Sequence, residues 1–356
     1  MDTIRSRPMR EAKRARMAEI DAQIHRLQTE RGLHEQKLAE YAYPVLSLPN
    51  EIVSEILIQS LPSYPACPPL KGPSSPTSLT HICRQWRDIA LATPQLWRAI
   101  PLRASSDDKT PRDWLERSGS CPLSIKMESD EQARLHPQTL AAILLHHERW
   151  ERAHAACEFT LQVPNGLIPR TKRPRAHADF PRLRTLSLDC LDDLAYWFPW
   201  TQLTSLTLTN PSSATYFSTL QGAVNLVHLK TIDCYQEPHA QLTDVTLPRL
   251  ETFIMVDTEF GYFEQGLGVF ILPSLRTLQV PAAFLGNNPL DTFASFVAKS
   301  GCTQLQKVLI TGEYGEISKP MFRSRFPGII FAFNSRYDWH KRRDRDEEDS
   351  SDSESE

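Results

Sequence analysis

The stretch Leu183-Arg184-Thr185-Leu186-Ser187-Leu188 contains the pattern that decides the fold, with leucines at its first, fourth and sixth positions. Five later stretches have apolar residues at the same positions, and the single exception is Thr231. They begin at Leu203, Leu226, Leu250, Leu275 and Leu305, so that successive stretches are 20, 23, 24, 25 and 30 residues apart. Alternating apolar residues predict a short strand with one buried face. Because one such strand cannot bury that face alone, the regular spacing predicts strands that stack around a shared core.

Leucine-rich repeats have periods of about 20–29 residues, and only the last of these spacings lies just outside that range. The asparagine or cysteine expected at the ninth position of a repeat occurs once, as Cys234, so the turn that asparagine normally forms is mostly missing. The predicted fold class is therefore α+β with repeat character. It comprises an N-terminal helix, a small helical module, an irregular leucine-rich-repeat-like α/β solenoid arc and a disordered acidic tail.

Strand alternation predicts which side chains of these stretches point outward, since positions one, four and six point into the core. Repeat proteins bind partners on such extended concave faces, so these side chains form the predicted target-binding surface. The first predicted row is Thr185, Ser205, His228, Thr252, Thr277 and Lys307, and the second is Ser187, Thr207, Lys230, Ile254, Gln279 and Leu309. Ile254, Val256 and Leu309 are apolar where solvent is expected. Either a partner covers them, or the C-terminal segment does, or the register differs there.

The composition is that of a globular protein, with 356 residues, 40% hydrophobic and 23% charged. The seven cysteines are odd in number, scattered and without a C-x-x-C pair, which favours reduced thiols over a secreted disulfide framework. No apolar segment has the length of a bilayer span, and none follows the arginine-rich start as in a signal peptide. We therefore expect a protein of the cytoplasm, the nucleus or both.

The sequence shows no catalytic signature, since it lacks a G-x-S-x-G elbow and a Walker A loop. The best metal-ligand candidates are His147, His154 and Cys157, but zinc takes about four ligands. A surface helix that carries histidines is the preferred interpretation. We therefore expect no enzyme activity, no cofactor and no metal. A pI near 6.4 without a basic aromatic surface also argues against nucleic-acid binding.

Residues 9–42 have the pattern of a polar helix with an apolar seam. Met17, Ile20, Ile24 and Leu27 follow the a/d spacing of a coiled coil, Arg31 and His34 interrupt it, and Leu38 and Tyr41 restore it. Two interpretations remain open. The helix forms a homodimer, or it packs on its own chain or is simply solvated.

Residues 46–98 contain two short helical patterns around a proline-rich insert, Pro62 to Pro76, which carries six prolines and reads as a loop. The first pattern is Leu46-Ser47-Leu48-Pro49-Asn50-Glu51-Ile52, followed by Ile56-Leu57. The second is Leu79-Thr80-His81-Ile82-Cys83-Arg84-Gln85-Trp86-Arg87-Asp88-Ile89-Ala90, followed by Pro94-Gln95-Leu96-Trp97. Its apolar residues are three and four apart, which predicts one amphipathic helix with Ser78 as N-cap.

These residues resemble an F-box, because the L-P-x-E-I opening, the C-R-x-W-R-x-I-A helix and the closing L-W occur in the F-box order. The stretch Trp114-Leu115-Glu116-Arg117-Ser118-Gly119-Ser120-Cys121-Pro122-Leu123-Ser124 also resembles the W-x-x-R-S-x-x-x-P-L-S segment of F-box proteins that are numerous in mushroom-forming fungi. The proline-rich insert departs from the F-box pattern, because typical members have a shorter connection between the two helices. It puts in question whether the helices dock on their partner in the usual geometry.

The resemblance implies the substrate-recognition subunit of an SKP–cullin–F-box ubiquitin ligase. The box would bind the SKP-family adaptor, which links to the cullin scaffold, and the arc would bind an unknown target protein. The residues carried over for adaptor binding are Leu48, Pro49, Ile52, Ile56, Ile82 and Trp86. Some of these would face the adaptor and others would hold the box together. The alternative is an interaction scaffold outside the ubiquitin pathway, with the box-like helices as a structural cap.

The predicted domains are a coiled-coil-like helix at 1–44, the F-box at 45–98, the repeat-like domain at 99–340 and the acidic tail at 341–356. Within the third, Leu123 to Met127 reads as a strand, Thr139 to His154 as a helix and Phe159 to Val163 as another strand. The tail is assigned as disordered because its run of acidic residues and serines cannot bury apolar surface.

Overall fold

The computed structural model describes residues 6–40, 47–103, 109–128, 137–155, 180–189, 198–234, 243–256, 266–312 and 319–334. The chain divides into two compact units, residues 1–56 and residues 57–356. The predicted strand at Phe159 to Val163 and the predicted acidic tail lie outside the described residues. The boundaries of the four predicted domains stay predictions. No helix in the described part is long and apolar enough to cross a membrane.

The first unit consists of a long helix and the start of a short one. Helix α1 (Ser6–Glu40) confirms the predicted N-terminal helix, and its side chains are exposed from Met9 to Leu38. Its ion pairs Arg16–Glu19 and Arg31–Glu35 lie in water and contribute little to stability. Helix α2 (Asn50–Gln59) begins directly after Pro49, whose carbonyl accepts from the backbone N–H groups of Ile52 and Val53 at 3.0 and 3.1 Å.

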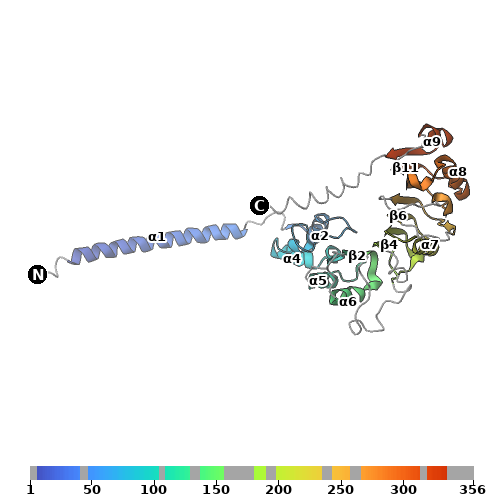
Figure 1. Cartoon of the computed structure of the whole chain (residues 1–356). Coiled ribbons are helices and arrows are strands. Elements are labelled where there is room, and N and C mark those ends of the chain that lie inside the picture. The colour runs from blue at the N-terminus through green and yellow to red at the C-terminus, as the bar shows by residue number, and fades with distance from the viewer. Residues whose placement is uncertain are drawn as a thin grey trace. The chain divides into compact units, whose positions relative to one another are not determined.

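The second unit is built on a ten-stranded parallel sheet in which strand order follows chain order (Figure 1). Its strands are β1 (Ala99–Arg103), β2 (Leu123–Glu128), β3 (Trp150–Ala155), β4 (Thr185–Asp189), β5 (Ser205–Thr209), β6 (His228–Ile232), β8 (Thr252–Val256), β10 (Thr277–Pro281), β11 (Lys307–Thr311) and β12 (Ile330–Asn334). Strands β7 (Val245–Thr246) and β9 (Phe270–Ile271) form a separate parallel pair. The described strands do not close into a barrel.

Helices connect many of these strands, and Figure 1 shows α5 to α8 along one side of them. The α-helices are α3 (Pro76–Leu79), α4 (Arg84–Leu91), α5 (Lys109–Arg117), α6 (Pro137–Leu144), α7 (Ser213–Gly222), α8 (Pro289–Ser300) and α9 (Lys319–Arg325). The 3₁₀ helices are η2 (Pro94–Trp97), η3 (His147–Arg149), η5 (Trp200–Gln202), η6 (Gly266–Val269) and η7 (Ala282–Leu285).

The apolar positions of the six leucine-containing stretches form the core, as predicted. Their buried residues are Leu183, Leu186, Leu188, Leu203, Leu206, Leu208, Leu226, Leu229, Leu250, Phe253, Met255, Leu275, Leu278, Val280, Leu305, Val308 and Ile310. The exception, Thr231, is also fully buried, and its hydroxyl lies 3.0 Å from that of Tyr216 on α7. Because Tyr216 supplies a hydrogen-bond partner, a polar residue is tolerated at a position that otherwise takes leucine.

Two helix predictions are wrong in extent. The helix predicted from Thr139 to His154 ends at Leu144 in the structure, and β3 begins at Trp150. The strand is explained by its pairing with both β2 and β4 and by the alternate burial of Ala153 and Ala155. Trp150 is also buried, and the pairing with β2 shifts by one residue after it. The predicted strand from Leu123 to Met127 is confirmed as β2.

The single helix predicted from Leu79 to Ala90 is divided into α3 and α4. Ser78 is not an N-cap, because its hydroxyl donates to the carbonyl of Ser75 at 2.6 Å, inside α3. Ser75 caps α3 instead, and Cys83 caps α4.

Candidate functional site

Helix α2 has apolar side chains on two sides, and only one of these is buried. Val53 and Leu57 are buried, whereas Ile52 and Ile56 are 49% and 41% exposed. Ile52 and Ile56 are four residues apart, so they lie on one face of the helix, one turn from each other. Leu48 before the helix is half-buried, and Pro49 is exposed. The helix therefore keeps an exposed apolar face, formed by Ile52 and Ile56, in addition to its buried face.

The second part of the box-like sequence is organised by its cysteine and its tryptophans. The Cys83 sulfur accepts from the backbone N–H of Trp86 at 3.4 Å, which starts α4 at Arg84 and gives the C-R-x-W spacing a capping role. Ile82, just before the cap, is 54% exposed. Trp86 is half-buried, and its indole N–H is buried without a hydrogen-bond partner among the described residues.

The closing Leu96-Trp97 belongs to the core of the second unit. Trp97 is fully buried, and its indole N–H donates to the carbonyl of Ala90 at 2.9 Å. Its ring meets that of Trp114 on α5 edge-on, with centroids 5.8 Å apart. These contacts connect the end of α4 to the helix that packs on β1, so α4 and the sheet belong to one packed body.

The outward face of the sheet carries the two predicted rows in register. Strand pairing aligns the first row from Thr185 to Lys307 and the second from Ser187 to Leu309 without a shift. Every side chain of both rows is half-buried or exposed. The pairing of Ile254 with Lys230 and Gln279 rules out the alternative that the register differs there. Whether this face binds a target stays a prediction.

The same face continues over the first three strands, where its character changes. Register extends the second row from Ser187 to His154, Lys126 and Pro101. Burial lowers the pKa of His154 from its ordinary value, although the nearby Asp189 carboxylate opposes this. The outward face is therefore charged at its β1–β4 end, rich in hydroxyls on β4 and β5, and partly apolar at Ile254 and Leu309.

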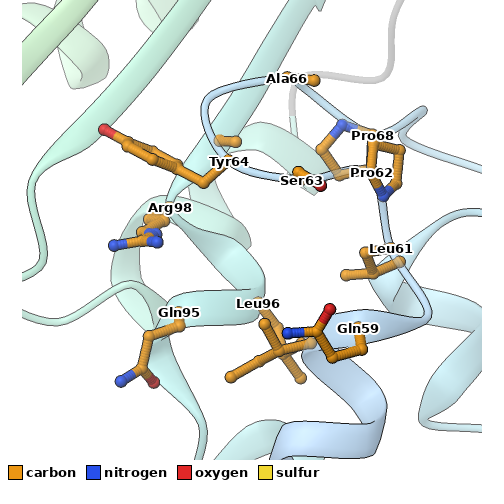
Figure 2. A pocket seen from close by; sticks show the side chains of 12 residues that line it. Gln59, Leu61, Pro62, Ser63, Tyr64, Ala66, Pro68, Gln95, Leu96 and Arg98 are labelled. Atoms are coloured by element: carbon orange, nitrogen blue, oxygen red, sulfur yellow. The ribbon is translucent and has the colours of Figure 1, made fainter.

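The insert lies against the charged end of this face. The Tyr64 hydroxyl donates to the Glu151 carboxylate at 2.8 Å, and the Arg98 guanidinium lies 3.9 Å from the centre of the Tyr64 ring, as Figure 2 shows for Tyr64 and Arg98. The Ser124 hydroxyl of β2 donates to the carbonyl of Pro65 at 2.8 Å. Burial, followed by the bond to Glu151, raises the pKa of Tyr64 and keeps it a neutral donor.

Cys67 of the insert is packed against β2 as a thiol. Its sulfur lies 3.7 Å from the Ser124 carbonyl, and burial raises its pKa to about 11. Since the thiolate is the reactive species, this cysteine is a poor nucleophile near neutral pH.

Two cavities adjoin the insert. The smaller, of about 160 Å³, lies under the stretch from Leu61 to Pro68 and is closed below by Gln59, Leu96 and Arg98 (Figure 2). The larger, of about 450 Å³, lies between the stretch from Cys67 to Lys71 and the strands β1 and β2. Its lining includes Arg103, Lys126 and Glu128. We call this larger space the insert cavity.

Replacement of Tyr64 by phenylalanine is expected to lower the free energy of unfolding by about 1 kcal/mol, because it removes one partly buried hydrogen bond to a carboxylate. Urea denaturation of Tyr64→Phe, Glu151→Gln and the double variant measures the coupling between the two side chains. If the two single effects simply add, the bond between Tyr64 and Glu151 does not hold the insert in place.

Of the three candidate metal ligands, the two that the structure describes lie in different surroundings. The Nδ1 atom of His147 lies 2.8 Å from the carbonyl of Leu144, inside the core, whereas His154 lies on the outward face of β3. Cys157 is outside the described residues. Among the residues that the structure describes, no three histidine, cysteine or acidic side chains gather in an arrangement that could hold a metal ion.

No protein-family model matches this chain, and no curated protein matches its sequence. The residues that sequence reasoning missed are those of the insert and of the β1–β2 end of the outward face. For β2 a signal was present, because the alternation in Leu123-Ser124-Ile125-Lys126-Met127-Glu128 already places Ser124, Lys126 and Glu128 on one face.

Proposed function

We propose that this protein is the substrate-recognition subunit of an SKP–cullin–F-box ubiquitin ligase. The observation that carries the proposal is the exposure of Ile52, Ile56 and Ile82, three isoleucines at positions of the box-like sequence for which the resemblance implies adaptor contact. A partner that covers such side chains gains roughly 25 cal/mol for each Å² of apolar surface removed from water. Leu48, Pro49 and Trp86 are the other proposed contacts, and the half-buried Leu48 and Trp86 also have a packing role.

The outward face of the sheet is the proposed target-binding surface of a leucine-rich-repeat-like arc. Two features support the repeat interpretation: buried apolar residues recur at the same positions of each stretch, and the strands follow one another in a parallel order. Most side chains of this surface are polar, in the row from Thr185 to Lys307 and in the row from Ser187 to Leu309; Ile254 and Leu309 are the apolar members of the two rows. This composition favours recognition through hydrogen bonds over a purely apolar interface.

The test is co-expression of the full chain with an SKP-family adaptor, followed by size-exclusion chromatography. We expect a stable complex in which the two proteins elute together and then recruit the cullin scaffold. A folded chain that elutes without the adaptor would contradict the proposal. The second candidate, a scaffold outside the ubiquitin pathway, would then be preferred, since the burial of Trp97 also fits a box that serves as a structural cap.

Self-association through α1 is a separate proposal, supported by its exposed apolar seam of Met17, Ile20, Ile24 and Leu27. We expect the full chain to sediment as a dimer at micromolar concentration, and Ile20→Asp/Leu27→Asp to sediment as a monomer because two carboxylates would then lie in the seam. Ala22→Asp is the matched control, since Ala22 lies on the opposite side of the predicted seam. A wild-type chain that is monomeric throughout would rule out the dimer.

A further inference from the structure

The outward face of the sheet already holds one proline-rich segment, which is the insert. Strand pairing places Ser124 of β2 in line with Arg152 of β3 and Thr185 of β4, so Ser124 continues the row that runs from Thr185 to Lys307. The Ser124 hydroxyl donates to the carbonyl of Pro65 at 2.8 Å. A side chain of this row therefore binds the backbone of a proline-containing segment within the same chain.

The insert crosses the first strands and does not follow any one of them. Its Tyr64 hydroxyl donates to Glu151 of β3, and its Cys67 sulfur lies 3.7 Å from the Ser124 carbonyl of β2. The stretch from Cys67 to Lys71 then faces β1 and β2 across the insert cavity. The segment thus passes from β3 towards β1, which is the direction of the row.

From β4 onward the two rows carry hydroxyl groups that the rest of the described structure does not use. The side chains concerned are all half-buried, and no side-chain hydrogen bond joins them to another described residue. They are Thr185, Ser187, Ser205, Thr207, Thr252 and Thr277. Because a hydroxyl can donate to a backbone carbonyl, as that of Ser124 does, these rows can bind a further segment in the same way.

The spacing of the strands matches the period of a polyproline II helix. Neighbouring strands lie about 4.7–4.9 Å apart, so every second strand adds roughly 9.6 Å along the row. A polyproline II helix rises about 3.1 Å per residue and repeats after three residues, so one turn measures roughly 9.3 Å. A segment in this conformation that crosses the strands would present one carbonyl per turn to Thr185 of β4, His228 of β6 and Thr277 of β10.

A proline-rich segment also suits a surface of hydroxyl donors. Proline has no backbone N–H, so such a segment offers carbonyls as its backbone hydrogen-bonding groups. Its polyproline II conformation is largely formed before binding. A flexible segment offers the same carbonyls, but it loses more conformational freedom when it is bound.

We propose that the rows from β4 to β11 bind a proline-rich segment of the target protein, which crosses the strands as the insert does. This rests on the proposed function, because it takes the outward face as the target-binding surface. The hydroxyls of the rows donate to carbonyls of the segment. The insert occupies the same path over the first three strands, so the target segment lies next to it in the direction of the rows.

The test is fluorescence polarisation of the full chain with a labelled peptide of four Pro-Pro-Ala repeats and blocked ends. A peptide of four Gly-Ser-Ala repeats is the comparison. We expect saturable binding of the proline peptide that does not change with KCl, because the peptide is uncharged. We expect the Gly-Ser-Ala peptide to bind at least tenfold more weakly. Thr185→Val/Thr252→Val/Thr277→Val removes three row hydroxyls at nearly constant shape and is expected to weaken binding of the proline peptide at least tenfold.

Thr201→Val/Thr246→Val/Thr303→Val removes three exposed hydroxyls outside the rows and is expected to bind the proline peptide as the wild type does. The proposal would be wrong if the proline peptide does not bind, if both peptides bind equally, or if the row variant binds no more weakly than this control. Adaptor co-elution tests the box independently. A chain that binds the adaptor but not the proline peptide would keep the proposed function and refute this inference alone.

Discussion

Replacing Ile52 and Ile56 together by aspartate is expected to abolish co-elution with the SKP-family adaptor while the fold remains intact. Both side chains lie on the exposed side of α2, opposite to the buried Val53 and Leu57, so their replacement removes little core packing. In a complex the two carboxylates would be placed in an apolar contact without partners, and unpaired charges at the centre of an interface are among the most damaging changes known. We expect at least a hundredfold loss of affinity, or about 2.7 kcal/mol.

Two other variants make this result specific. Val224→Asp introduces one carboxylate at an exposed apolar residue outside the box and is expected to leave adaptor binding unchanged. Val53→Asp lies on the buried side of α2 and is expected to reduce folding itself, seen as a lower melting temperature. If the Ile52→Asp/Ile56→Asp protein binds the adaptor like the wild type, this face of α2 is not the contact.

Replacing Trp97 by alanine is expected to lower the free energy of unfolding by about 3–5 kcal/mol. The side chain is fully buried, donates to Ala90 and packs on Trp114, and the Arg117 guanidinium lies 4.6 Å from the centre of its ring. The change leaves a cavity and removes one donor to the Ala90 carbonyl, which still accepts from the backbone N–H of Thr93 at 3.3 Å. Because these contacts connect α4 to the sheet, we expect the substitution to destabilise the sheet as well as the box.

Urea denaturation followed by circular dichroism measures this effect, and Trp86→Ala is the matched control. Trp86 is only half-buried, so its truncation should cost less than half as much. A loss below about 1 kcal/mol in Trp97→Ala would show that the end of the box is not held to the sheet through this side chain.

The central strands could be predicted because their burial follows a simple rule. Consecutive residues of a strand face opposite sides of the sheet, so Leu186 and Leu188 face the same side. If a strand paired one residue out of register, all of its apolar side chains would face solvent, and the apolar pattern therefore also fixes the register. Strand β1 could not be recognised in this way. It contains Pro101, which argues against a central strand. Among the described strands, however, β1 pairs with β2 alone and lies at the edge of the sheet, where proline is tolerated.

The positions of the candidate site residues were predictable where they depend on local sequence and not where they depend on distant contacts. Ile52, Ile56 and Ile82 were identified from the box-like order of residues, and the outward rows from alternation. The position of the insert depends on contacts such as Tyr64 with Glu151, which are 87 residues apart in the chain. Nothing in the composition of a proline-rich loop indicates which surface it will cover.

The order of the sheet also determines how the second unit would respond to a mechanical load. Within the part of the chain that the structure describes, each of the ten strands is hydrogen-bonded to its direct neighbours in the sheet, and the order of the sheet is the order of the chain. A pull on the C-terminal side would therefore detach β12 from β11 first, then β11 from β10, and each step would release only a short length of chain. Under tension such a unit gives way in small successive extensions, and the strands near the box would be the last to be loaded.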